Sequence, residues 1–145
     1  MAGVAVALAV GAIGCGGSGR LSRSEFTAKA NGICGKYDAK IKAAMANVTN
    51  DPASIARGVD KTIPLIQQAQ DEFAKLDPPK ALDANWKEWQ GINDDEIATA
   101  KQLSAAAKKN DKASFDSALA KLDSQDKNST RLAKQMGLST CAESS

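Results

Sequence analysis

Apolar residues recur every three or four positions in four stretches of the chain, near residues 22–48, 51–77, 79–109 and 110–136. This spacing places an apolar stripe along each stretch and predicts four amphipathic helices. The stripes of the first two helices are Phe26, Ala30, Ile33, Tyr37, Ile41, Ala44 and Val48, then Ile55, Val59, Ile63, Ile66, Phe73 and Leu76. Those of the last two are Leu82, Trp86, Trp89, Ala100, Leu103 and Ala107, then Phe115, Leu119, Leu122, Ser129, Leu132 and Met136.

Polar and conformationally special residues mark the helix ends. Ser22 and Glu25 have the spacing of a capping box, and Asp51-Pro52 supplies an N-cap followed by proline at the first helical position. Gly137 is placed as a glycine C-cap after the fourth helix. Short connections at about residues 49–51, 77–79 and 109–111 force consecutive helices to be antiparallel. We therefore expect residues 22–145 to form an all-α, up-down-up-down four-helix bundle.

The first fourteen residues form an uncharged apolar run that is shorter than the roughly 20 residues needed to span a bilayer. Its length suits the core of a secretory signal, and small residues follow it. The sequence Ala12-Ile13-Gly14-Cys15 resembles the lipobox of bacterial lipoproteins, whose cysteine carries a diacylglycerol and becomes the mature N-terminus. The resemblance implies a signal peptide at residues 1–14, lipidation of Cys15 and a flexible tether at residues 15–21. The alternative is an unstructured apolar tail or a core helix.

The chain has three cysteines, an odd number for an exported protein. Lipidation of Cys15 leaves Cys34 and Cys141, which we expect to pair in an oxidising compartment. In the predicted bundle the C-terminal tail reaches Cys34 if residues 137–141 turn back, extended, along the groove between the first and fourth helices. Free buried thiols or a reactive thiolate are the alternatives.

Two short elements resemble those of small bacterial secreted or lipid-anchored helical proteins. These elements are Ala30-Asn31-Gly32-Ile33-Cys34 and Gly137-Leu138-Ser139-Thr140-Cys141. The resemblance spans about 110 residues and supports the cysteine pair, but it implies no activity.

Composition excludes several classes of function. The net charge is only +2 and the basic residues are spread along the chain, so we expect no nucleic-acid partner. The chain has no histidine, which excludes a Cys-His nucleophile and disfavours haem and di-iron sites. The acidic run Asp94-Asp95-Glu96 is expected on a solvated helix face, because consecutive side chains diverge by about 100°. We therefore expect no metal, no cofactor and no catalytic residue.

Trp86 and Trp89 are the candidate contact residues for a ligand or partner, because they share one helix face. They also continue an apolar stripe, so a place in the core is the alternative. The first functional hypothesis is a non-catalytic envelope lipoprotein, anchored to the outer face of the cytoplasmic membrane or otherwise secreted, that presents helices to a protein or cell-wall partner. The second is a small-molecule-binding or sensor-type envelope lipoprotein, with a pocket opened beside Trp86 by Pro64 and a weak centre of the third helix.

Overall fold

The computed structural model describes residues 19–143, and the regular secondary structure of this part of the chain is entirely helical. The prediction of an all-α protein is confirmed for these residues. The expected signal segment and Cys15 lie outside them. The elements are α1 (Arg23–Met45), α2 (Pro52–Phe73), the short 3₁₀ helix η1 (Lys80–Leu82), α3 (Asp83–Lys108), α4 (Lys112–Met136) and α5 (Ser139–Glu143).

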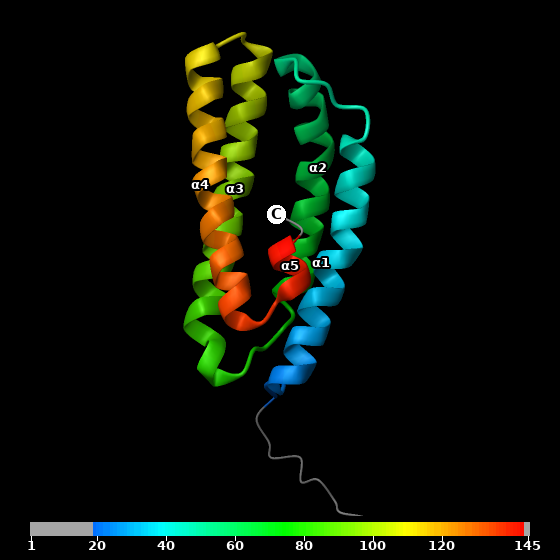
Figure 1. The fold of residues 1–145 in the computed structure, drawn as a ribbon, viewed down its shortest axis with the longest axis vertical. Coiled ribbons are helices and arrows are strands. Elements are labelled where there is room, and N and C mark those ends of the chain that lie inside the picture. The colour runs from blue at the N-terminus through cyan, green and yellow to red at the C-terminus, as the bar shows by residue number, and fades with distance from the viewer. Residues whose placement is uncertain (1–18, 144–145) are drawn as a thin grey trace, which may run out of the picture.

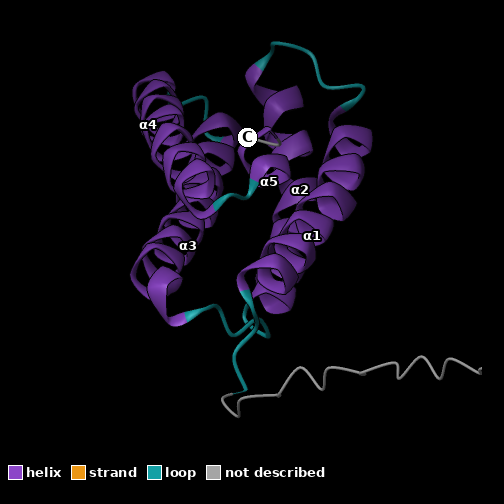
Figure 2. Ribbon diagram, turned by 60° about the horizontal axis from the view of Figure 1, so that its bottom comes forward, coloured by secondary structure: helices purple, strands orange, loops and turns teal. Residues whose placement is uncertain are grey.

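The long helices form two hairpins. Figure 1 shows α1 and α2 side by side on the right and α3 and α4 side by side on the left. Contacts between α2 and α3 join the hairpins. The short helix α5 lies between α1 and α4 and packs against both, as the second view also shows (Figure 2). The two hairpins therefore enclose a fifth helix at one end.

The helix ends follow the caps expected from the sequence. The Ser22 side chain accepts from the backbone N–H of Glu25, and the Glu25 carboxylate accepts from the backbone N–H of Ser22. Asp51 caps α2 through the backbone N–H of Ser54. The third helix differs slightly, because residues 80–82 form the 3₁₀ turn and α3 begins only at Asp83. The capping predictions for α1 and α2 are confirmed.

The C-terminal tail differs from the extended strand expected at residues 137–141. Gly137 ends α4 with a φ of 81°, and the Leu138 N–H donates to the carbonyl of Ala133, as in a Schellman cap. This turn reverses the chain and buries Leu138 completely. Residues Ser139–Glu143 then form α5, and the Thr140 N–H donates to the side chain of Asn31 on α1. The tail docks as a helix because its backbone groups find partners in that form.

Cys34 and Cys141 form the expected disulfide, which joins α1 to α5. Their Cα atoms are 5.1 Å apart and 107 positions separate them in the sequence. The pairing is confirmed, and it fixes α5 to α1.

The core has an aromatic half and an alanine-rich half. Phe26, Phe73, Trp86 and Trp89 form the aromatic half near α5. Small residues of α2, α3 and α4 around Leu103 form the other half. Leu119 is 41% exposed, so its place in the fourth stripe was predicted wrongly. Half-buried positions occur in both of the first two stripes, namely Ile33, Ile41, Ala44 and Val48 in the first and Ile55, Val59, Ile63, Ile66 and Leu76 in the second. In α2 the larger side chains are half-buried because the helix turns its smaller ones, such as Ala56 and Gly58, toward its neighbours.

Candidate functional site

A cavity of about 180 Å³ lies between the two hairpins. All five α-helices contribute to its lining, with α5 supplying one half of the disulfide. One lining residue from each helix, in chain order, is Tyr37, Ile66, Trp89, Ser129 and Cys141. A cavity of this size is comparable to the engineered cavity of about 150 Å³ that binds benzene. It therefore has room for a compact molecule containing one ring.

Small polar side chains form the wall where α3 and α4 meet. The Ser129 hydroxyl donates to the side-chain carbonyl of Asn93 at 3.2 Å, and both residues are buried. Asn93 belongs to the segment that was expected to weaken the middle of α3, yet α3 is continuous through it. The hydrogen bond joins α3 to α4 beside the cavity.

Two residues that line this cavity each have a buried polar atom without a hydrogen-bond partner among the described residues. These atoms are the indole Nε1 of Trp89 and the carboxylate Oε1 of Glu96. Trp89 is only 4% exposed. Buried polar groups in native proteins are nearly always paired, and a buried group without a partner costs about 1–3 kcal/mol. A bound ligand or water molecule would supply the partners that the described residues do not.

The cavity carries negative charge. Its lining includes Asp38 of α1, Glu96 of α3 and Asp126 of α4, and none of its lining residues is basic. Burial is the main reason that the pKa of Glu96 is raised to about 7, and the nearby Asp126 carboxylate raises it further. Asp38 is paired with Lys42 on the outer side of α1 at 2.7 Å. Of these carboxylates, Glu96 is therefore the one whose negative charge is least balanced by nearby positive charge.

Two hollows lie at the α3–α4 turn and lack these features. One of about 220 Å³ is lined by residues that include Pro52, Asn110 and Phe115, and the other, of about 570 Å³, by residues that include Lys109 and Lys121. None of the buried polar atoms without a partner belongs to a residue of either hollow. The cavity between the hairpins is the better candidate site.

The candidate contact residues of the sequence lie inside the protein. Trp86 and Trp89 stack on each other with ring centroids 5.1 Å apart, which confirms that they share a face, and each is 4% exposed. Trp86 packs against Phe26 and Phe73 and does not line the cavity. The observed cavity lies beside Trp89, and the pocket expected beside Trp86 is not found there.

The position of Glu96 was predicted wrongly. Asp94 and Asp95 are exposed, as expected for the acidic run, but Glu96 turns inward. The helical period carried the signal, because Glu96 follows Trp89 by seven positions and Asn93 by three. These spacings place all three on one face of α3. Sequence reasoning missed Glu96 because it treated Asp94, Asp95 and Glu96 as one solvated group, and it did not consider Asn93 or Asp126 as site residues.

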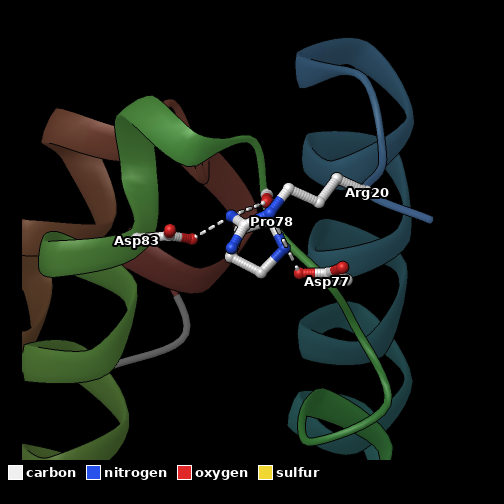
Figure 3. A network of polar contacts seen from close by, with 4 residues as sticks. All are labelled: Arg20, Asp77, Pro78 and Asp83. Carbon is white, nitrogen blue, oxygen red and sulfur yellow. Dashed lines mark hydrogen bonds and ion pairs between the residues drawn. The ribbon is translucent and has the colours of Figure 1, made fainter. Parts of the chain in front are cut away.

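Arg20 and Leu21 are held firmly where the expected tether meets the folded domain. Arg20 donates to the Asp83 carboxylate and to the carbonyl of Pro78, and its Nε lies 3.9 Å from Asp77 (Figure 3). The backbone N–H of Leu21 donates to the carbonyl of Asp77. The last two residues of the expected tether therefore belong to the folded domain.

Two further observations apply to residues 19–143. No three His, Cys, Asp or Glu side chains among these residues are placed to hold a metal ion. Within the same range, every helix is too short or too polar to cross a bilayer.

Comparisons with known proteins gave no match to a family model, to a curated protein or to a solved structure. The site is therefore interpreted from its own chemistry. That chemistry consists of an indole N–H and a buried carboxylate at one cavity.

We expect Glu96 to make the stability of the protein depend on pH. The folded-state pKa of about 7 lies above the ordinary pKa of 4.5 for a glutamate, so the folded chain binds more protons than the unfolded chain between these values. The free energy of unfolding therefore falls as the pH rises from about 4.5 to 7. Above about pH 7 the full destabilisation by the ionised Glu96 carboxylate is present. Above pH 7, Glu96→Gln is expected to raise the free energy of unfolding by about 2 kcal/mol, a value reduced to allow for solvent screening.

Urea unfolding of the wild type and the Glu96→Gln variant across this pH range measures the effect. Glu88→Gln is the matched control, because Glu88 lies on the exposed side of α3 and faces Arg131 at 3.7 Å. The control is expected to keep the wild-type pH dependence. Equal pH profiles for the wild type and Glu96→Gln would show that Glu96 is not the titrating group.

Proposed function

We propose that this protein is a non-catalytic, lipid-anchored protein of the cell envelope that binds a small molecule in the cavity between its helical hairpins. Residues 22–145 form the binding domain, an up-down-up-down four-helix bundle to which α5 is added. The observation that carries the proposal is the pair of buried, unpartnered polar atoms on Trp89 and Glu96 at one cavity. Ligand sites combine an apolar lining with a few polar groups, and this cavity has that composition.

In this proposal the N-terminal segment directs export and anchors the protein to the membrane. Residues 1–14 are the signal peptide, Cys15 carries the lipid, and the chain from Cys15 to Gly19 is the tether. The lipobox pattern supports this, as does a disulfide between the other two cysteines. The intact mass of protein recovered from its own envelope tests it. A chain that begins at Cys15 with a diacylglycerol agrees with the proposal, and an unprocessed chain without lipid contradicts it.

Binding is favoured over catalysis by the other groups at the cavity. Glu96 and Asp126 place two carboxylates there, and acid–base enzymes use such pairs. The side chains that serve most often as nucleophiles are nevertheless occupied or missing. Cys34 and Cys141 are oxidised to a disulfide, the Ser129 hydroxyl donates to Asn93, and the chain has no histidine. The proposal therefore assigns no catalytic residue and no cofactor.

Presentation of a helical surface to a protein or cell-wall partner has less support. Protein-binding surfaces usually expose a contiguous apolar patch. Among the described residues, Leu119 is the one large apolar side chain that is exposed. The cavity is the stronger argument.

The two tryptophans of the chain provide a direct test of binding. A nitrogen–proton correlation spectrum of the labelled protein contains one indole signal from each, and Trp86→Phe assigns them. Titration with a library of small soluble compounds is expected to give hits that shift the Trp89 indole signal, because Trp89 lines the cavity and its N–H has no partner among the described residues. The Trp86 signal is the internal control. A library in which no compound shifts the Trp89 signal selectively would contradict the proposed function.

A further inference from the structure

The charges around the cavity indicate what kind of ligand it accepts. Carboxylates line it from three different helices, while α2 and α5 contribute only uncharged lining residues. Asp38 has Lys42 as a partner, but Glu96 accepts no hydrogen bond in the described part of the chain. A buried carboxylate is stabilised by a cation that also donates hydrogen bonds, and such charge-assisted bonds are the strong ones. An anionic ligand would be repelled by the same groups.

Besides its carboxylates, the site contains a hydrogen-bond donor, the Trp89 N–H. Indole nitrogen is a donor only, so its partner must be an acceptor such as a hydroxyl or carbonyl oxygen. Trp89 is only 4% exposed, and its Nε1 has no hydrogen-bond partner among the described residues. This second observation is independent of the acidic residues. Ile41, Ile66 and the disulfide add apolar surface to the lining of the same cavity.

We propose that the ligand is a compact organic cation, a protonated amine on an apolar body that also carries a hydrogen-bond acceptor. This inference rests on the proposed function and names the ligand class for the same site. The ammonium group binds the Glu96 carboxylate, with Asp126 adding to the negative potential. The acceptor binds the Trp89 N–H, and the apolar body lies against Ile66 and the disulfide. The cavity of about 180 Å³ limits the body to about one ring.

Three probes of nearly equal size separate these contributions. They are 2-amino-1-phenylethanol, which has the cation and the acceptor, 2-phenylethylamine, which has the cation alone, and 1-phenyl-1,2-ethanediol, which is neutral. Dissociation constants are measured from the Trp89 indole signal at about pH 8, where Glu96 is mostly ionised. The amino alcohol is expected to bind at least about tenfold more tightly than the diol, because a charge-assisted hydrogen bond is worth roughly that factor. The simple amine is expected to fall between them.

The variant Glu96→Gln tests whether the cation preference comes from this residue. It keeps the shape of the side chain and removes the charge, so the tenfold preference is expected to disappear. Glu88→Gln, on the exposed side of the same helix, is expected to keep it. This comparison excludes a general effect of net charge.

The possible outcomes separate the inference from the proposed function. Equal binding of the diol and the amino alcohol, or a preference that survives Glu96→Gln, overturns the inference and leaves the binding function intact. Failure of all three probes at about 10 mM, a limit set by ordinary ligand efficiency, overturns it too if other library compounds bind at Trp89. If no compound of any class binds there, the proposed function itself is wrong.

Discussion

Replacing both Cys34 and Cys141 with alanine is expected to lower the free energy of unfolding by about 4 kcal/mol. The disulfide closes a loop with a sequence separation of 107, and a cross-link over such a loop removes much of the conformational entropy of the unfolded chain. Removal of native disulfides from small domains typically costs about 2–5 kcal/mol. Urea unfolding of the oxidised wild type and the double variant measures the difference. Since Cys34 and Cys141 line the same cavity as Trp89, the Trp89 indole signal is also expected to shift.

Reduced wild-type protein is the matched control for this double variant. It lacks the cross-link but keeps both sulfur atoms, one of which belongs to the buried Cys141. The reduced protein and the double variant are expected to lose similar stability, because the cross-link is the dominant contribution. If the reduced protein kept its full stability while the alanine variant lost it, the sulfur packing would be the cause. A loss below about 1 kcal/mol in both would contradict the role of the disulfide.

Local signals explain why the helices and the disulfide were predictable. The capping box at Ser22 and Glu25 and the N-cap at Asp51 act within one helical turn, so they are visible in the sequence. Gly137 is similar, because few other residues adopt its φ of 81°. The cysteine pair followed from counting, since assigning Cys15 to lipid left two. None of these predictions required knowledge of how the hairpins pack.

The cavity and α5 depend on packing that the sequence does not display. Helix α5 has only five residues, too few to show a period, and the docking of Thr140 on Asn31 crosses 109 positions. The half-buried stripe of α2 also reflects packing, because Ala56 and Gly58 face the neighbouring helices in place of larger side chains. Glu96 could have been found from its spacing to Trp89. The sequence does not, however, display the cavity that this carboxylate lines.

Trp86→Ala is expected to lower the free energy of unfolding by about 4 kcal/mol, the usual range for truncating a large buried aromatic residue. The Trp86 ring meets Phe26 edge-on at 5.0 Å and Phe73 at 5.7 Å, and it stacks on Trp89. Alanine removes these contacts and leaves a cavity in the core where α1, α2 and α3 meet. Urea unfolding measures the loss, and Leu119→Ala, at the exposed position on α4, is expected to change stability by less than about 0.5 kcal/mol.

Trp86→Phe separates packing from any role of the indole N–H. Phenylalanine keeps an aromatic ring between Phe26 and Phe73, so its loss of stability is expected to be clearly smaller than that of alanine. Ligand binding at Trp89 is expected to survive in the Trp86→Phe variant, because Trp86 does not line the cavity. If Trp86→Ala cost less than about 1 kcal/mol, the aromatic cluster would not be the main core. If Trp86→Phe abolished binding while the fold remained stable, the ligand would have to contact Trp86, and the site would lie on the other side of the stacked pair.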